Sequence, residues 1–588
     1  MPLFLQQPSF ARGELSPRLY ARADIPHYSV ALKECVNWTV LRQGGLRRRS
    51  GTRFIAATKD STKKSRLIPF VFSTVQAYAL EFGDQYIRIY ANGGRVESSG
   101  SPVEVAVPYT EAQLKDVQFA QSADVLYLAH PLHPPAKLTR TSDTSWTYTV
   151  ISFTATPGDW GAGDYPGAVS FYEERLCWAR TNSKPQTIWM SKAGILENFG
   201  TSSPAEADDA ITLTILSGRV DAIQWIAEGT ADLVIGTAGA MRTLGPGERG
   251  DIFSATNFAQ RQQSQYGAAK VQPIQVGNAL LFTDFYGQAV REFAYSWESD
   301  AFVSPDATIL SEHILQPGVI EMAWQQAPDA VAWMVIKNGQ IAAMTFEKEQ
   351  DMVSVYRHKI GGVDGEQDHA TVESVAVIPG DDRDEVWMTV KRTIDGATAR
   401  YVEQLQAPFE YGDIKDAFFV DSGLSYNGAP TNSVSGLGHL EGEEVAILAD
   451  GANVIPQTVT DGAITLPEGL EASIIHAGLP FVSRGRTLSS PVSMGDGSGL
   501  GREKRVTKTL LDVFEAGAMK VGTGRKQEEA ILRDVDDHMD APVPLTSRII
   551  EVRHDSRWKE DGGEVVFLVD RPVPATVRSV TAAMTLGG

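Results

Sequence analysis

Seven clusters of short β-type runs recur along residues 65–405, and this repetition constrains the fold more than any other feature. Each cluster holds three or four runs rich in branched and aromatic residues, separated by Gly, Asn, Asp and Pro turns. The step is roughly 40–55 residues, and the clusters begin near residues 77, 116, 168, 223, 274, 320 and 372. This period predicts a β-propeller, in which sheets stack around an axis because no single sheet buries both faces alone.

One alternative fold stays open for this region. Evenly spaced short strands also fit two packed β-sandwiches, and the signature sets of the WD and kelch propellers are absent. Tryptophans recur inside the expected strands, where they are more often core than a carbohydrate platform. They are Trp178, Trp189, Trp225, Trp324, Trp333 and Trp387.

The predicted fold class is mostly β, with a propeller-like repeat domain, small additional β domains and an extended N-terminal arm. Residues 1–60 form the arm, since Pro2, Pro8, Pro17 and Pro26 interrupt any helical period there. The propeller-like domain is expected over 61–410. A small β domain with Asp-Gly turn signals is expected over 411–492, and a C-terminal β domain over 493–588.

Charge separates the arm from the rest of this acidic chain. The whole chain carries a net charge of −20, yet residues 1–70 carry +9 and the remainder −29. Such asymmetry suggests that the basic segment meets a different partner. We expect the arm to dock on an acidic neighbouring protein or on nucleic acid, although its aromatic residues are too sparse to favour base stacking. We also expect it to be dispensable for folding; a solvated surface loop is the alternative. The candidate docking residues are Arg42, Arg47, Arg48, Arg49 and Arg53.

Motifs that carry chemistry are missing from the sequence. It has no Gly-x-x-x-x-Gly-Lys-Ser/Thr loop, no Gly-x-Ser-x-Gly elbow and no His-Glu-x-x-His helix. The two cysteines, Cys35 and Cys177, cannot build a disulfide framework or a four-thiolate metal site. No apolar run approaches the roughly 20 residues of a membrane span, and the first residues lack a signal-peptide pattern. We therefore expect no enzymatic activity, cofactor or metal, and synthesis in a reducing cytoplasm.

Several strings resemble a known structural family. The most specific is the N-terminal one, Ser9-Phe-Ala-Arg-Gly-Glu-Leu-Ser-Pro-Arg-Leu-Tyr-Ala-Arg-Ala-Asp24 with Cys35-Val-Asn-Trp38 and Gln43-Gly-Gly-Leu-Arg-Arg-Arg-Ser-Gly-Thr-Arg-Phe54. Later strings agree: Asp421–Gly428, Val434–Glu443, His476–Phe481 and Val569–Val580. Together they resemble the tail nozzle family, also called tail tubular protein B, of short-tailed bacteriophages and prophages.

The resemblance implies a ring, a hexamer, at the distal end of a short virion tail. An adaptor ring would lie above it, fibres or spikes would dock on it, and genomic DNA would pass through during ejection. A channel that does not hold phosphate needs an acidic rather than a basic wall. The expected lining residues are Asp381, Asp382, Asp384, Asp534, Asp536 and Asp537. Two other functions stay open: a receptor- or glycan-binding tail propeller, and a glycan-cleaving enzyme.

Overall fold

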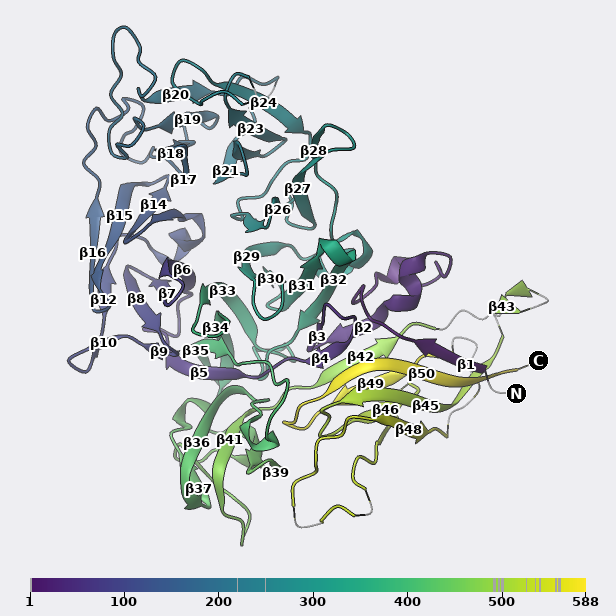
Figure 1. The fold of residues 1–588 in the computed structure, drawn as a ribbon. Coiled ribbons are helices and arrows are strands. Elements are labelled where there is room, and N and C mark those ends of the chain that lie inside the picture. Colours follow the sequence, from purple (N-terminus) through teal and green to yellow (C-terminus); the bar gives the residue numbers. More distant parts are fainter. Residues whose placement is uncertain are drawn as a thin grey trace.

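The protein contains a seven-bladed β-propeller, to which two further β domains are attached (Figure 1). The structure is a computed structural model, and it describes residues 3–218, 220–248, 250–489, 493–494, 497–498, 502–524, 526–534, 536–538, 541–555, 558 and 562–587. The propeller prediction is confirmed, and the alternative of two packed sandwiches is wrong. Each blade is a four-stranded antiparallel sheet whose first strand lies nearest the axis.

Blades 1–7 follow one another along the chain, and blade 7 takes its outermost strand from the N-terminal segment. From the inner to the outer strand they are β6 (Arg66–Ser73), β7 (Gln76–Gly83), β8 (Tyr86–Ala91) and β12 (Glu104–Ala106); β13 (Gln118–Ser122), β14 (Val125–His130), β15 (His133–Ser142) and β16 (Ser145–Val150); β17 (Ala168–Tyr172), β18 (Arg175–Ala179), β19 (Thr187–Met190) and β20 (Ile211–Thr214); β21 (Ile223–Glu228), β22 (Leu233–Thr237), β23 (Met241–Gly245) and β24 (Ala259–Ser264); β25 (Ile274–Val276), β26 (Ala279–Thr283), β27 (Val290–Ser296) and β28 (Ala301–Val303); β29 (Val319–Gln325), β30 (Val331–Ile336), β31 (Ile341–Glu347) and β32 (Met352–His358); β33 (Thr371–Pro379), β34 (Asp384–Ile394), β35 (Ala397–Leu405) and β5 (Thr52–Ala57).

Hydrophobic clusters fill the seams between adjacent blades. Trp178 and Trp189 lie in the seam between blades 2 and 3, Trp225 in that between blades 4 and 5, and Trp387 in that between blades 7 and 1. Each of these side chains is at most 1% exposed. Trp333 is also buried and Trp324 is half-buried. The strand tryptophans therefore hold blades together, as their apolar area favours.

The N-terminal segment closes the ring. Strand β5 pairs antiparallel with β35 as the fourth strand of blade 7, and Ala56 on it packs into the seam with blade 1. Strand β2 (Leu32–Val36) lies beside β32 of blade 6 in parallel, joined through Val36 and Arg357. One short segment thus supplies an outer strand to two neighbouring blades, and β5 completes the one that meets blade 1.

The two smaller domains continue the sheets of these blades. Beyond β5 lies the small β domain, with β36 (Asp421–Thr431), β37 (Ser433–Ser435), β38 (Glu444–Ala449), β39 (Ala452–Thr458), β40 (Ala463–Thr465) and β41 (Ala472–Leu479). Beyond β2 lies the C-terminal domain, with β42 (Ser483–Thr487), β43 (Ser493–Met494), β44 (Gly497–Ser498), β45 (Lys504–Phe514), β46 (Lys520–Gly522), β47 (Gln527–Glu529), β48 (Ile549–Arg553), β49 (Val566–Val569) and β50 (Thr576–Leu586).

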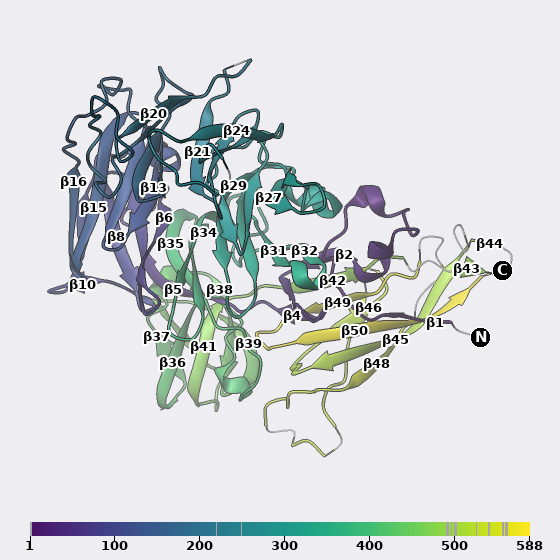
Figure 2. The same ribbon diagram turned by 45° about the horizontal axis from the view of Figure 1, so that its top comes forward.

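Both ends of the chain belong to the C-terminal domain. Strand β1 (Leu3–Gln7) pairs with β50 (Figure 2). Strand β3 (Trp38–Val40) pairs with β4 (Leu46–Arg48), which also pairs with β50. This sheet packs on the one built from β42, β49 and β46, through a core that includes Phe567 and Val577.

The remaining elements are short and lie between the strands already described. They are β9 (Gly94–Arg95), β10 (Glu97–Ser98), β11 (Ser101–Pro102), η1 (Pro17–Leu19), η2 (Pro26–Val30), η3 (Glu111–Asp116), η4 (Ile309–Ser311), α1 (Glu312–Leu315), η5 (Lys348–Gln350), η6 (Ile414–Asp416) and η7 (Gly438–Leu440).

The expectation that residues 1–60 form an arm outside the main β domains is therefore wrong. Its prolines interrupt any long helix but allow two short 3-10 turns, η1 and η2, and strand pairing with distant partners. Its five strands enter three different sheets. Sequence reasoning missed this because the partners lie hundreds of residues away.

Removing residues 1–57 should abolish cooperative folding. The deletion exposes the unpaired edge of β35, opens the seam beside blade 1 and leaves the C-terminal sheet without β1 and β4. We expect insoluble protein, or soluble protein without a sharp thermal transition, by circular dichroism and calorimetry. Supplying residues 1–60 as a separate peptide during refolding should restore part of the transition. A truncated chain that melts as sharply as the full chain would contradict this role.

Candidate functional site: an arginine junction and an axial cavity

The arginines of the N-terminal string lie at the point where the three domains meet. Arg47, Arg48 and Arg49 are at most 6% exposed. Arg47 pairs with Asp329 and Glu410, Arg49 pairs with Asp421, and Arg48 donates to backbone carbonyls, all within the same chain. This corrects the expectation that these three dock on a neighbouring protein, because a buried cation must be paired or hydrogen-bonded inside the fold. Arg42 and Arg53 are exposed, so for them docking stays a prediction.

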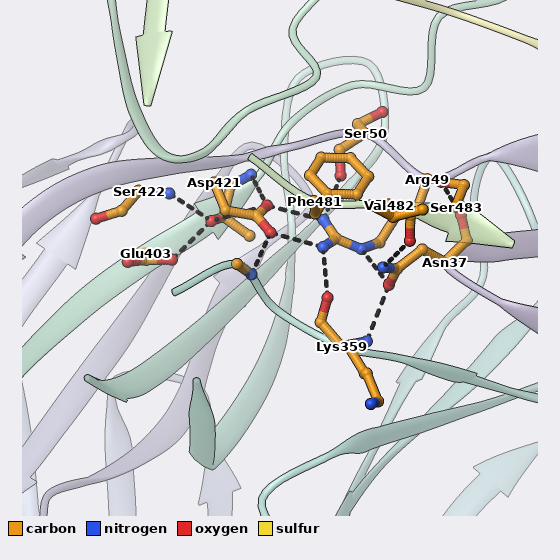
Figure 3. A network of polar contacts seen from close by, with 12 residues as sticks. Asn37, Arg49, Ser50, Lys359, Glu403, Asp421, Ser422, Phe481, Val482 and Ser483 are labelled. Carbon is orange, nitrogen blue, oxygen red and sulfur yellow. Dashed lines mark hydrogen bonds and ion pairs between the residues drawn. The ribbon is translucent and has the colours of Figure 1, made fainter. Parts of the chain in front are cut away.

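Arg49 and Asp421 form a fully buried, two-pronged ion pair (Figure 3). Arg49 Nη1 and Nη2 donate to the two carboxylate oxygens of Asp421 at 2.8 and 2.6 Å. The backbone N–H groups of Thr52 and Gly361 donate to the same carboxylate at 3.1 and 2.7 Å. Arg49 also donates to Asn37 Oδ1 at 3.0 Å. Such complete pairing is what makes a buried ion pair tolerable in a low-dielectric core.

A second buried pair joins the first through Thr52. Arg392 of β34 contacts Glu403 of β35, both side chains being fully buried. Thr52 Oγ1 donates to Glu403 Oε2 at 2.6 Å and accepts the Ser422 N–H at 3.0 Å. Blade 7, the N-terminal segment and the small β domain therefore share one continuous polar network. Networks of this kind are sensitive to the loss of any member.

Arg48 reaches in the other direction, towards the C-terminal domain. Its guanidinium donates to the carbonyls of Val573 at 2.8 Å and Phe481 at 3.0 Å, and it lies 4.5 Å from the centre of the Phe481 ring. Arg49 lies over the same ring at 3.8 Å. Burial, and then the neighbouring Arg49 charge, lower the pKa of Arg48 to about 9, so Arg48 remains a cation at neutral pH.

Gly51 makes the close packing of this junction possible. A Cβ at this position would collide with the backbone of Val420 in the segment that precedes Asp421. The Gly51 N–H donates to Phe418 O at 2.8 Å. Glycine is the residue that lets two backbones approach this closely. The Arg-Arg-Arg-Ser-Gly string thus carries both the charges and the narrow contact.

The six acidic residues expected to line a channel lie in two separate places. Asp381 and Asp382 are exposed in the turn between β33 and β34. Asp384 instead accepts the backbone N–H groups of Gln326 and Ala327 at 2.6 and 3.0 Å, and so ties blade 7 to blade 6.

The other acidic group lies in the C-terminal domain. Asp534 pairs with Arg548 at 2.7 Å, and its N–H donates to Asp537. Asp536 is exposed beside them. Among the described residues, no hydrogen bond or ion pair joins this group to the turn of blade 7. Whether the groups face a shared channel stays a prediction about the assembled ring.

A cavity of about 670 Å³ lies on the propeller axis. The inner strands β6, β13, β25, β29 and β33 line it, together with η3 and the turn between β30 and β31. Its volume is in the range of small-ligand sites. Sequence reasoning missed this site, because its residues come from five blades that are far apart in the sequence.

Among the described residues, no group of three or more His, Cys, Asp or Glu side chains is placed to hold a metal ion. No helix in that part of the chain combines the length and the apolar character of a membrane span.

No family model and no curated protein matches the chain. Solved structures similar to it include the WD40 repeats of RRP9 (9% identity, 61% of this chain, 100% of that chain, TM-score 0.38). Others are the β-propeller domain of Cps50 (Swd1) from Myceliophteria thermophila (8% identity, 60% and 100%, TM-score 0.37) and YCF48 bound to D1 peptide (8% identity, 64% and 99%, TM-score 0.34). Likeness at this level carries no argument about function.

Replacing Arg49 with alanine should destabilise the protein strongly. The substitution leaves the Asp421 carboxylate buried without its cation, which costs about 3–5 kcal/mol in comparable sites. The loss of stability for Arg49→Lys should lie between zero and the loss for Arg49→Ala, because an ammonium keeps the charge but cannot make the two-pronged contact. The matched control is the exposed Arg53→Ala, expected within about 0.5 kcal/mol of the wild type. Urea unfolding curves provide the measurement, and equal losses for Arg49→Ala and Arg53→Ala would refute the junction's role.

The junction should also make stability depend on acid pH. Burial alone would raise the pKa of Asp421, but the Arg49 charge and hydrogen bonds and the Gly361 N–H hold it below its usual range. The Asp421 carboxylate therefore binds a proton more readily in the unfolded chain than in the folded one. The stabilisation by the Arg49–Asp421 pair is complete above about pH 4 and is lost as pH falls through the pKa of Asp421 in the folded protein.

Unfolding free energies between about pH 2 and 5 test this dependence. Asp421→Asn should show a shallower loss of stability towards low pH than the wild type. The exposed Asp381→Asn should retain the wild-type slope. Parallel slopes in all three proteins would contradict the assignment.

Proposed function

We propose that this chain is a structural tail protein of a short-tailed bacteriophage, of the tail nozzle type, that assembles into a hexameric ring through which genomic DNA passes. The observation that carries the proposal is the position of the N-terminal string Ser9–Phe54. The residues that most specifically resemble the nozzle family are the ones that join the propeller, the small β domain and the C-terminal domain.

The position of the N-terminal string at the domain junctions gives a physical reason why its residues are specific. Phe10, Trp38 and the three arginines are buried at domain junctions, where each side chain has a fixed shape and partner. A chain with this string therefore needs the same three-domain architecture. A rigid multidomain block is also what a ring-forming tail component requires, because interfaces between subunits demand fixed relative surfaces.

In this proposal, DNA passes through a channel between the subunits of the ring and not along the propeller axis. The axial cavity of about 670 Å³ has the volume of a small-ligand pocket. A duplex, whose major groove alone is about 12 Å wide, does not fit through it. An acidic inter-subunit wall would avoid the salt-sensitive phosphate contacts that Lys and Arg make. Asp381, Asp382 and Asp536 are exposed and available for such a wall.

Electron microscopy of the purified protein tests the proposal. We expect sixfold rings at high protein concentration or with the adaptor protein of the same genome, and weak duplex binding at about 0.15 M salt. Antibodies should label the virion tail. Arg42→Glu with Arg53→Glu should weaken assembly with the adaptor, whereas the control Lys415→Glu with Lys526→Glu should not. A protein that stays monomeric with the adaptor and is absent from tails would overturn the proposal.

One observation favours the alternative of a receptor-binding protein. Trp297, in the turn between β27 and β28, is 88% exposed, and Tyr286 on the same blade is 72% exposed. Large exposed aromatic side chains are typical of binding surfaces. Protein that forms no ring, adsorbs to host cells and blocks infection would favour this alternative over the nozzle.

A further inference from the structure

The axial cavity has apolar walls and a basic mouth. Its walls include Leu114, Val271, Ile274, Ile320, Ile336 and Val372. Four lysines line it as well: Lys64 before β6, Lys115 on η3, Lys270 before β25 and Lys337 after β30. All four are exposed. Four cations from four blades converge on one opening in a protein with a net charge of −20.

The carboxylates around this cavity are already engaged. Glu321 accepts from Arg66 at 2.9 Å and from the Val375 N–H at 3.1 Å. Glu373 makes two hydrogen bonds with Arg400 at 2.7 and 3.0 Å.

The positive charges of the lysines have fewer partners of opposite charge. Lys270 contacts Asp116 at 3.1 Å. Within the described part of the chain, Lys64, Lys115 and Lys337 make no side-chain ion pair. Glu111, the remaining acid of the lining, accepts the backbone N–H of Lys64 at 2.9 Å. The mouth therefore keeps uncompensated positive charge.

Two polar atoms at the cavity lack a partner within the described protein. Ser65 is 5% exposed, and its Oγ makes no hydrogen bond. Gln272 donates through Nε2 to Phe119 O at 3.2 Å, while its Oε1 is buried and accepts nothing. A buried polar atom without a partner costs free energy, so each favours a ligand that completes it. Ser65 offers a hydroxyl donor, and Gln272 Oε1 requires an N–H or O–H donor.

We propose that the axial cavity binds an acidic peptide segment of a partner protein, with its carboxylates at the lysines and its apolar side chains inside. A peptide supplies all three features that the cavity lacks: negative charge, apolar groups and backbone N–H donors for Gln272. Inorganic phosphate and nucleic-acid backbones are mostly acceptors and have no apolar side chains to cover the walls. The inference does not depend on the nozzle assignment, since the cavity is complete within one chain.

Fluorescence anisotropy with the full-length protein tests this site. The probe is a fluorescein-labelled peptide that alternates glutamate and leucine, titrated at low salt. We expect saturable binding that weakens with added salt, because the attraction is electrostatic. Peptides in which lysine replaces glutamate, or serine replaces leucine, should bind at least about tenfold more weakly, a difference of about 1.4 kcal/mol.

Variants locate the binding on the cavity. Lys64→Ala with Lys337→Ala should weaken binding about tenfold or more, and Ser65→Ala should weaken it by a smaller factor. The charge-matched control, Lys415→Ala with Lys526→Ala in the other domains, should bind as the wild type does. Unchanged thermal transitions would show that each variant is folded.

Three results would overturn the proposal. They are the absence of saturable peptide binding, an equal loss in the control and the cavity variants, and displacement of the peptide by inorganic phosphate or duplex DNA at concentrations comparable to its own. Ring formation in the electron microscope is a separate readout, so failure here and failure of the nozzle assignment are distinguishable.

Discussion

The contact between Arg49 and Asp421 is the interaction on which the arrangement of the domains depends. The two residues are 372 positions apart, yet they meet in a fully buried, two-pronged ion pair. Arg49 donates to both oxygens of the Asp421 carboxylate, so each domain that contributes to the pair is held in one orientation. Hydrophobic packing tolerates small slips, whereas a buried charge tolerates almost none.

Sheets that are shared between domains also hold the domains in one orientation, through the hydrogen bonds of their backbones. The small β domain continues the sheet of blade 7 beyond β5, and the C-terminal domain continues that of blade 6 beyond β2. Domains joined by a linker move relative to each other by default. Here the N-terminal segment replaces such linkers with strand pairing, and Arg48 adds hydrogen bonds to the C-terminal domain. The three domains are thus joined by continuous sheets and side-chain hydrogen bonds rather than by linkers alone.

The propeller also separates charge along its axis. The lysines of the axial cavity lie where the inner strands begin, while Asp381 and Asp382 follow the end of β33 at the opposite end of its blade. A protein with a large net negative charge is soluble and repels nucleic acid over most of its surface. A small basic mouth in such a protein attracts acidic segments selectively, because the surrounding field disfavours long polyanions.

From the sequence alone, seven strand clusters, their spacing and a propeller-like fold could be predicted, since the central strands are apolar and recur with a regular step. Outer strands such as β24 were not predictable, because they are polar and half-exposed and carry no alternating pattern. The role of the Arg47–Arg49 string was misread for a different reason. A run of arginines is the same string whether it faces solvent or a buried carboxylate, and the acids that neutralise it lie far away in the chain. Local periodicity therefore determined the propeller, and tertiary contacts alone decided which strand closes it, which charges are buried and where a ligand cavity forms.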